Sequence, residues 1–438
     1  MRFQLLDKMP ISIVVQRAIS QLFLFDEILV QSRRQQDEFE YVFRDSEFAW
    51  NAIEFTAKRP FSVMEFECLF KSLEFNMYWR TVSIRNCEAF DNTALSSLLH
   101  NSLRHNTHLH LLDLSSNFLS DEAVTILSQA LAQTLPSVSS LKILNLSRNQ
   151  ISRRGVESLF DALKFVLITS LNISDNLLDE TCSSVVSECL VYTSLTSLDV
   201  SMNAGVLIDY CAVKQSLLEV LHVGYTNCLK GDQYLQADNL KELHVETCNI
   251  SDVGLVALVG NSTLNQLNIS QNELLQNRSV MTVFGETLRM GASNLVVLNL
   301  SEIRLDDVVP LLMNGVQSHE SLEHLIMRRC ELSAFAIRQL VASLLPSSKL
   351  HVLDVSQNNF GIEGVRALLH PTNHGLKDIC VACCGISTPA DELSLLELVS
   401  IVNTLDSLDV SGNFRIHQHK FDMVLAKSSG EPDLSPWY

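Results

Sequence analysis

Three cysteines lie close together near the C-terminal end of the chain. The stretch CVACCGI, residues 380–386, places Cys380, Cys383 and Cys384 within five positions. A Cys-x-x-Cys pair is the spacing of thiols that bind zinc or exchange disulfides. A zinc site needs four ligands, and the local spacing supplies no fourth one. Whether these thiols do chemistry therefore depends on the segment that carries them.

That segment belongs to a motif that recurs along most of the chain. The stretches LHLLDLSSNFL (109–119), LKILNLSRNQI (141–151) and LNQLNISQNEL (264–274) share the pattern L-x-x-L-x-L-x-x-N-x-L. Thirteen copies can be aligned over residues 79–416, at intervals of 22 to 32 residues. The position of the pattern's Asn is occupied in turn by Cys87, Asn117, Asn149, Asn176, Asn203, Thr226, Cys248, Asn272, Ile303, Cys330, Asn358, Cys384 and Asn413. A fixed period of this length indicates a stacked array of repeats.

The repeat resembles the leucine-rich repeat, in particular the ribonuclease-inhibitor-like subclass with Asn and Cys at the turn. The L-x-L segment has the period of a short strand whose alternate residues point inward. One repeat cannot bury its own apolar face, so neighbours must stack. The resemblance implies an α/β fold: a leucine-rich repeat solenoid, or horseshoe, with a parallel concave β-sheet and convex helices.

The repeat frame gives the cysteines structural roles. Cys384 falls at the turn position. Ile379 and Val381 are predicted to point inward, which makes Cys380 the exposed residue between them, and Cys383 lies just past the strand. We therefore expect no metal site and no disulfide among the three thiols.

Most intervals between strands show apolar residues at helical spacing. Examples are residues 120–133, 152–165, 306–318 and 390–403. Between Asn203 and Asn272 the intervals shrink to 23, 22 and 24 residues, and Gly231 interrupts one of them. Extended or short 3₁₀ segments are predicted there after Thr226 and Cys248, in place of full helices.

The two ends of the chain lack the repeat. Residues 1–78 are predicted as a helical N-terminal cap, with an almost wholly apolar helix at 11–30 and a second helix opened by the capping box of Ser62 and Glu65. This segment could cap the array, dock a partner, or do both. Residues 417–438 are predicted as a C-terminal cap and tail, in which Trp437 and Tyr438 are candidate contacts.

Composition narrows the function classes. The net charge of −18 opposes nucleic-acid binding, and no run of eighteen apolar residues predicts a membrane span. Eleven scattered cysteines suit a reducing, cytoplasmic setting, including the cytoskeleton or axoneme; a mitochondrial presequence is the minor alternative. Phosphate loops, nucleophile elbows and metalloprotease helices are missing from the sequence, so we expect no catalysis, cofactor or small-molecule substrate.

Solenoids bind other proteins on extended concave surfaces, and this is the predicted function. The exposed strand column mostly carries Asp or Asn, and departures from that consensus are the predicted contacts. These partner-binding candidates are His222, Tyr225, His244, Glu246, Ile326, Arg328 and Arg329.

Three functions remain open at this point. The array resembles leucine-rich subunits of ciliary and flagellar assemblies such as the dynein regulatory complex, which implies a non-enzymatic scaffold in a multi-subunit complex. It also resembles the Ran GTPase-activating protein, although that family's strongly acidic tail is not matched by AKSSGEPDLSPWY at the C-terminus. Met9-Pro10 followed by a helix faintly resembles an F-box adaptor of ubiquitin ligases.

Overall fold

The computed structural model describes residues 39–46, 49–57, 80–85, 103, 106–133, 140–226, 238–248, 250–290, 294–344, 349–370, 375–401 and 405–413. The chain divides into two units, Met1–Cys228 and Leu229–Tyr438, which are described separately below. Among the described helices, none combines the length and apolar character that a membrane crossing requires.

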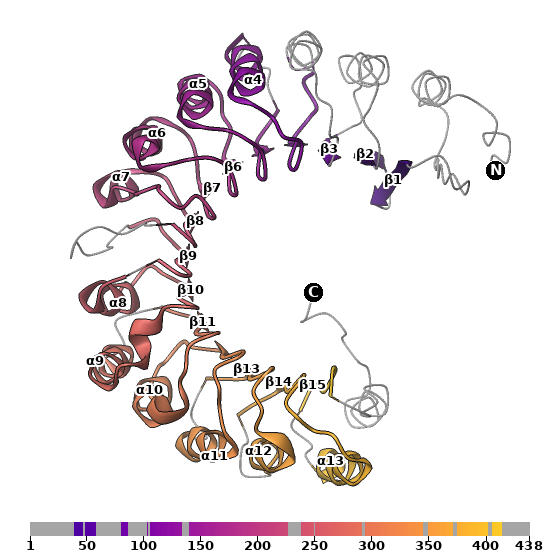
Figure 1. The fold of residues 1–438 in the computed structure, drawn as a ribbon, viewed down its shortest axis with the longest axis vertical. Helices are drawn as coiled ribbons and strands as arrows, with labels where there is room; N and C mark the ends of the chain where they lie inside the picture. The colour runs from indigo at the N-terminus through magenta and orange to yellow at the C-terminus, as the bar shows by residue number, and fades with distance from the viewer. Residues whose placement is uncertain are drawn as a thin grey trace, which may run out of the picture. The chain divides into compact units, whose positions relative to one another are not determined.

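Unit 1 is a sheet whose strands follow one another in chain order (Figure 1). Strands β1 (Phe39–Ser46) and β2 (Ala49–Ala57) form an antiparallel hairpin, and all later pairs are parallel. The later strands are β3 (Thr81–Arg85), β4 (Leu111–Asp113), β5 (Ile143–Asn145), β6 (Ser170–Asn172), β7 (Ser197–Asp199) and β8 (Val220–His222). Its helices are α4 (Asp121–Gln133), α5 (Arg153–Leu163), the 3₁₀ turn η1 (Glu180–Cys182), α6 (Ser183–Tyr192) and α7 (Tyr210–Gln215).

Unit 2 repeats the same parallel arrangement (Figure 1). Its strands are β9 (Glu242–His244), β10 (Gln266–Asn268), β11 (Val297–Asn299), β12 (His324–Ile326), β13 (Val352–Asp354), β14 (Asp378–Cys380) and β15 (Ser407–Asp409). Its helices are α8 (Asp252–Val259), η2 (Glu273–Gln276), α9 (Arg278–Arg289), η3 (Asp306–Val308), α10 (Val309–Val316), α11 (Ala334–Ser343), α12 (Gly361–Leu368) and α13 (Pro389–Ile401). Each unit is thus an α/β solenoid, as the repeat predicts.

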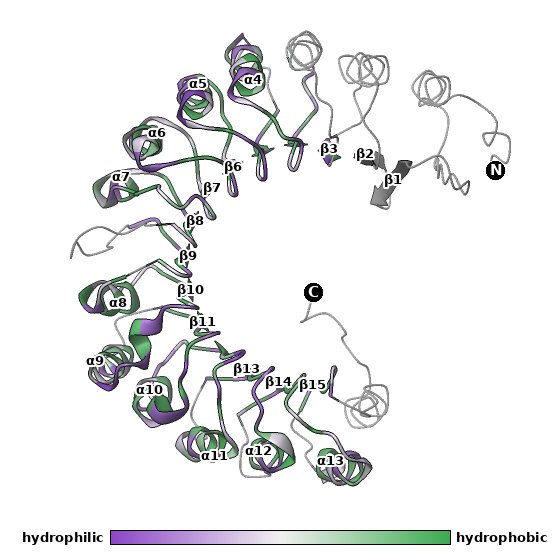
Figure 2. Cartoon of the chain, viewed as in Figure 1, coloured by the Kyte–Doolittle hydropathy of each residue, from purple (hydrophilic) through white to green (hydrophobic). Residues whose placement is uncertain are grey.

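The core of each unit lies between its sheet and its helices. Equivalent leucines pair in register from strand to strand, for example Leu298 with Leu325 and Leu325 with Leu353, and all three are fully buried. Helices contribute residues such as Phe284 of α9, which is also fully buried. Figure 2 shows hydrophilic and hydrophobic residues divided around helices such as α4 and α5, as expected for helices that cover a core on one side.

An asparagine ladder closes each repeat onto the next. The Oδ1 atom of Asn149 accepts hydrogen bonds from the backbone N–H groups of Asn117 (3.0 Å) and Leu119 (2.9 Å) in the preceding repeat. Its Nδ2 donates to the carbonyls of Leu114 (3.1 Å) and Leu146 (2.9 Å). The predicted turn role of this position is therefore confirmed: one side chain satisfies backbone groups of two repeats.

In the repeats that the structure describes, the residue just before the turn position has a left-handed backbone. Its φ lies between 51° and 67° in Ser116, Arg148, Asp175, Met202, Tyr225, Thr247, Gln271, Glu302, Arg329, Gln357, Cys383 and Gly412. In most members the N–H donates to a carbonyl of the next repeat, as in Arg329 N–H to Ser356 O (3.1 Å). We call this series the left-handed row.

The structure differs from the sequence prediction near the N-terminus. Within residues 1–78, predicted as helical, β1 and β2 form a hairpin. Strand β2 pairs in parallel with β3, with Ile53 opposite Val82, so the parallel part of the sheet begins one strand before the first recognised repeat and the hairpin adds β1 to it. The helices predicted at 11–30 and from Ser62, and the C-terminal segment 417–438, lie outside the described residues.

The predicted loss of helices in the middle of the array is only partly tested. Helix α7 has six residues, but α8 follows Cys248 with eight residues, so the prediction of no full helix there is wrong. Ser251 starts α8 because its Oγ accepts a hydrogen bond from the Gly254 N–H (3.1 Å). The segment 227–237, after Thr226, lies outside the described residues.

Candidate functional site

Most strands end in the same polar pair. An Asp or Asn at the last strand position accepts, through Oδ1, the backbone N–H of a serine two residues later, as Asn299 does from Ser301 (3.0 Å). The other pairs are Asp113–Ser115, Asn145–Ser147, Asn172–Ser174, Asp199–Ser201, Asn268–Ser270, Asp354–Ser356 and Asp409–Ser411. The Asp/Asn consensus is thus occupied by its own backbone, in the manner of an Asx turn.

Besides β3, where Ser83 and Arg85 take the two places, four strands of the array break both halves of this pair together. Their last residues are His222, His244, Ile326 and Cys380, and the residues two positions later are Gly224, Glu246, Arg328 and Ala382 instead of serine. These side chains are not committed to the Asx turn. They lie on the side of the sheet opposite the core, which we call the open face. The breaks at His222, His244 and Ile326 are therefore positions where the open face can carry specific contacts, whereas Cys380 is buried.

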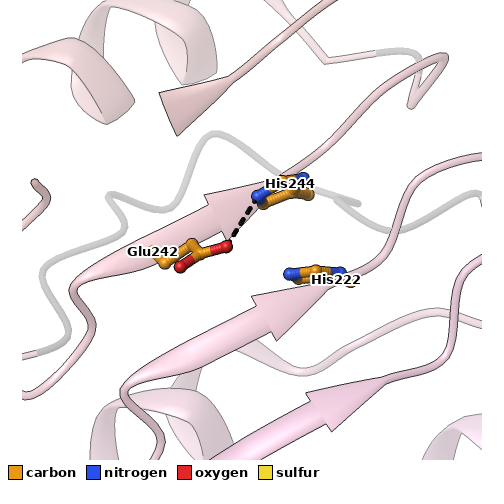
Figure 3. A group of neighbouring side chains, drawn as sticks. All are labelled: His222, Glu242 and His244. Carbon is orange, nitrogen blue, oxygen red and sulfur yellow. Dashed lines mark hydrogen bonds and ion pairs between the residues drawn. The ribbon is translucent and has the colours of Figure 1, made fainter. Parts of the chain in front are cut away.

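His244, a predicted contact, ends β9 and lies beside Glu242 (Figure 3), and Glu246 follows two residues later. Its Nε2 is 2.9 Å from Glu242 Oε1, and its Nδ1 is 3.4 Å from Glu246 Oε1. Glu246 also accepts a hydrogen bond from the Nδ2 of Asn268 on β10. A neutral imidazole donates from one nitrogen only, so contact of both nitrogens with carboxylates favours the imidazolium. Burial opposes that charge, but the hydrogen bonds and charges of Glu246 and Glu242 outweigh it and raise the pKa of His244.

This raised pKa predicts a pH-dependent stability for unit 2. The folded state holds the His244 proton more tightly than the unfolded state, so the stabilisation is complete below the ordinary pKa of 6.5. It is lost as the pH rises through the raised value. We expect His244→Gln to remove this decline in the free energy of unfolding, measured by urea denaturation across a pH series. The exposed His110 of unit 1 supplies a control, since His110→Gln should keep the wild-type decline; an unchanged decline in His244→Gln would contradict the assignment.

Ile326, Arg328 and Arg329 surround the end of β12. Ile326 is half-buried on the open face. The Nε of Arg328 donates to Oδ2 of Asp354 on β13, whose side chain is 1% exposed against 48% for Arg328. Arg329, in the left-handed row, is exposed, and its Nη1 lies 3.8 Å from Oε1 of Glu302. The three predicted contacts are thus neighbours around one strand end of unit 2.

The remaining predicted contacts divide between unit 1 and the tail. His222 ends β8 and is half-buried, and Tyr225 is 40% exposed in the left-handed row. Both belong to unit 1, whereas His244, Glu246, Ile326, Arg328 and Arg329 belong to unit 2. Trp437 and Tyr438 lie outside the described residues.

The sequence interpretation missed the partners of two predicted residues. Glu242 completes the β9 cluster, and Asp354 holds Arg328. A second Arg–Asp pair of the same kind joins Arg85, the last residue of β3, to the buried Asp113 of the next repeat (Nε to Oδ2, 2.8 Å). One feature of the sequence could have predicted these pairs: an arginine replaces the usual serine of one repeat, and the next repeat carries Asp at its Asp/Asn position.

The cysteine cluster has mostly the predicted arrangement. Cys384 occupies the turn, where its N–H donates to Asn413 Oδ1 (2.8 Å) and its Sγ donates to Val355 O (3.4 Å). Cys330 makes the equivalent thiol contact to Leu300 O (3.2 Å). Burial raises the pKa of the Cys384 thiol to about 12, which disfavours the reactive thiolate.

The prediction for Cys380 is wrong in one respect. Cys380 was expected to be exposed, but it is buried, and its Sγ donates to Asp409 Oδ2 of β15 (3.3 Å). A small side chain at this position lets the neighbouring strand's carboxylate approach and cover it. Cys383 remains exposed, in the left-handed row.

Comparison with known proteins agrees with this architecture. A family model described as "Leucine Rich repeat" matches residues 105–127, 139–160, 238–259 and 347–369. Human NACHT, LRR and PYD domains-containing protein 14 is 26% identical over 335 residues, covering 74% of this chain and 26% of that protein. The mouse protein 4C of the same series is 27% identical over 304 residues, covering 64% of this chain and 29% of that protein. The chain thus spans less than a third of the length of either relative.

Solved structures match the fold at low sequence identity. The chain in a structure described as "Crystal structure of TLR13-ssRNA13 complex" is 18% identical, with a TM-score of 0.50, covering 86% of this chain and 51% of that chain. The fold and the asparagine-closed turns define an α/β solenoid of the kind that presents an open sheet face for protein interaction. The chain is a leucine-rich repeat protein.

Proposed function

We propose that this chain is a non-enzymatic scaffold that binds a partner protein on the open face of unit 2, around β9 and β12. The loss of the Asx-turn pair at His244 and Ile326 carries the proposal. Elsewhere in this unit an Asp or Asn mostly serves the backbone, whereas these two strand ends place Glu246, Arg328 and Arg329 beside His244 and Ile326. In unit 1, His222 and Tyr225 are the corresponding candidates.

We further propose that the scaffold works within a large multi-subunit complex of the cytoskeletal or ciliary type. The support is the length of the repeat array and the lack of a catalytic motif in the sequence. Regulation of a small GTPase is the alternative that a direct assay separates most sharply. Faster GTP hydrolysis by Ran-like GTPases in the presence of the purified chain would favour it. Binding to a ubiquitin-ligase linker protein would favour the F-box alternative.

The partner is proposed to be a protein and not a nucleic acid. The net charge of −18 disfavours the phosphate contacts that supply most nucleic-acid affinity. The structural neighbour described with a single-stranded RNA shares only the fold at 18% identity, but it makes an RNA control worthwhile. Filter binding with a random single-stranded RNA at physiological salt provides that control.

The test of the proposed binding face is Ile326→Asp. A carboxylate at the centre of an apolar contact is expected to lower recovery of the chain's direct partners about tenfold, measured by affinity purification and quantitative mass spectrometry. Asn145→Asp in unit 1 is the matched control, because aspartate preserves the Asx turn at the end of β5, and its recovery should equal the wild type. Equal recovery with Ile326→Asp would show that the partner binds elsewhere.

A further inference from the structure

An apolar patch lies on the open face of unit 2 beside Arg328. Val297 of β11, His324 of β12 and Val352 of β13 are in register with one another, and all three are half-buried. Ile326 follows two residues after His324 on the same side of its strand. The equivalent positions on β9, β10, β14 and β15 are polar: Glu242, Gln266, Asp378 and Ser407. Burial is the main cause that lowers the pKa of His324, so its ring adds no charge at neutral pH.

Arg328 is held beside this patch by a buried carboxylate. Asp354 is fully buried, and its Oδ1 accepts the Ser356 N–H (3.0 Å) while its Oδ2 accepts from Arg328 Nε. A buried carboxylate is costly to leave unpaired, so Asp354 fixes the guanidinium in place. Pairing through Nε leaves the terminal amino groups at the exposed end of a side chain that is 48% accessible. Two parallel N–H groups in this orientation match a carboxylate.

Acidic groups flank the patch on both sides. On β9, Glu242 and Glu246 accompany His244, three strand steps from β12, or about 14 Å. On the other side of the patch, Asp378 lies on β14, two strands from β12, and Asp409 lies on β15, three strands from β12. Asp406 precedes β15, and Lys377 precedes β14. Burial, followed by the charge of Asp406, raises the pKa of Asp378.

We infer that unit 2 binds an extended peptide segment of a partner, in which an acidic side chain flanked by apolar residues meets Arg328 and basic residues lie on both sides. The peptide runs across the strands. At about 3.4 Å per residue, a basic residue about four positions from the acid reaches the β9 glutamates, and one about three positions away on the other side reaches β14. The inference rests on the proposed function and adds the chemistry of the partner to it. Arg328 supplies the contact, and Asp354 is its positioning residue.

Selection from a phage-displayed random dodecapeptide library tests this inference. The full chain is the bait, and parallel selections use Arg328→Lys, Asp354→Asn, Ile326→Asp and Arg85→Lys, each first checked for native circular dichroism. Lysine keeps the charge beside Asp354 but loses the planar fork, so the fold is retained while the contact is weakened. Arg85→Lys makes the same change in the other Arg–Asp pair, in unit 1. Affinities of the enriched peptides are then measured as synthetic peptides by fluorescence anisotropy.

We expect wild-type selections to enrich peptides with an Asp or Glu between apolar residues and Lys or Arg three to four positions away. These peptides should bind Arg328→Lys about tenfold more weakly than the wild type, and Asp354→Asn should also bind them more weakly. Arg85→Lys should bind them with the affinity of the wild type. Peptides that lose binding to Ile326→Asp but bind Arg328→Lys like the wild type would overturn the carboxylate contact and leave the proposed face intact. Peptides that bind Ile326→Asp as tightly as the wild type would overturn both the carboxylate contact and the proposed binding face.

Discussion

Replacing Asn358 with alanine is expected to destabilise unit 2 by about 3–4 kcal/mol, because one buried side chain serves five backbone groups. Its Oδ1 accepts from the N–H groups of Cys330 (2.7 Å) and Leu332 (3.1 Å). Its Nδ2 donates to the carbonyls of Met327 (2.8 Å), Val355 (2.8 Å) and Ser356 (3.2 Å). Alanine removes all five bonds; Ser356 O keeps the Arg329 N–H and Val355 O keeps the Cys384 thiol, whereas the N–H groups of Cys330 and Leu332 and the carbonyl of Met327 lose the Asn358 side chain as their partner. The measurement is the shift of the denaturant midpoint followed by circular dichroism.

Asn358→Cys is the matched control for this position. The chain itself places cysteine at equivalent turns, where the thiol of Cys330 donates to Leu300 O. Cysteine therefore restores one donor but cannot replace the Oδ1 acceptor, and its cost should be about half that of alanine. A cost below about 1 kcal/mol for Asn358→Ala would mean that water replaces the ladder bonds in solution.

Gly285→Ala is expected to cost about 2–3 kcal/mol, because helices α9 and α10 touch through their backbones at this point. A Cβ at Gly285 would lie 2.2 Å from the carbonyl oxygen of Leu311. From the other helix, a Cβ at Gly315 would lie 2.3 Å from the Gly285 carbonyl oxygen. Neither neighbour is a side chain that can rotate away, so the helices must separate and lose their packing. Thermal and urea unfolding of the variant measure this cost.

Gly260→Ala separates the steric effect from the general effect of removing a glycine. A Cβ at Gly260 would find its nearest atom, Val256 O, at 3.4 Å, which is an ordinary contact. The backbone there is right-handed, with φ of −76°, so alanine fits and should leave stability unchanged or raise it by about 0.5 kcal/mol. Similar losses in both variants would refute the backbone-contact explanation.

The fold could be predicted from the sequence wherever the repeat keeps its period. Leu325 and Leu353 are apolar at fixed positions of the pattern, and that spacing alone identifies β12 and β13. The hairpin β1–β2 was not predicted, because its alternating aromatics Phe39, Tyr41 and Phe43 lie in a segment that carries many charged residues and falls between two predicted helices. Alternation of that kind is a strand signal.

The candidate site could be predicted only in part. Departures from the Asp/Asn consensus identified His244 and Ile326, because a local motif is visible in one stretch of sequence. The pairing of Arg328 with Asp354 joins residues 26 positions apart, and its existence depends on the strand register. The burial of Cys380 likewise depends on the carboxylate of Asp409, 29 positions away. The pattern predicts that the repeats stack, but it does not predict which individual side chains of neighbouring repeats pair with each other.

The left-handed row has a consequence for how such a protein acquires new specificity. The row places the backbone of each member in the same strained conformation, and in members as different as Ser116, Met202 and Arg329 the N–H is used by the next repeat. The cost of that conformation is roughly 1–2 kcal/mol for residues other than glycine, and it is already included in the fold. Residues as different as Asp175, Met202, Tyr225 and Arg329 occupy it. A mutation from one such residue to another should be nearly neutral for folding, which makes this row a place where evolution can vary recognition without first repairing stability.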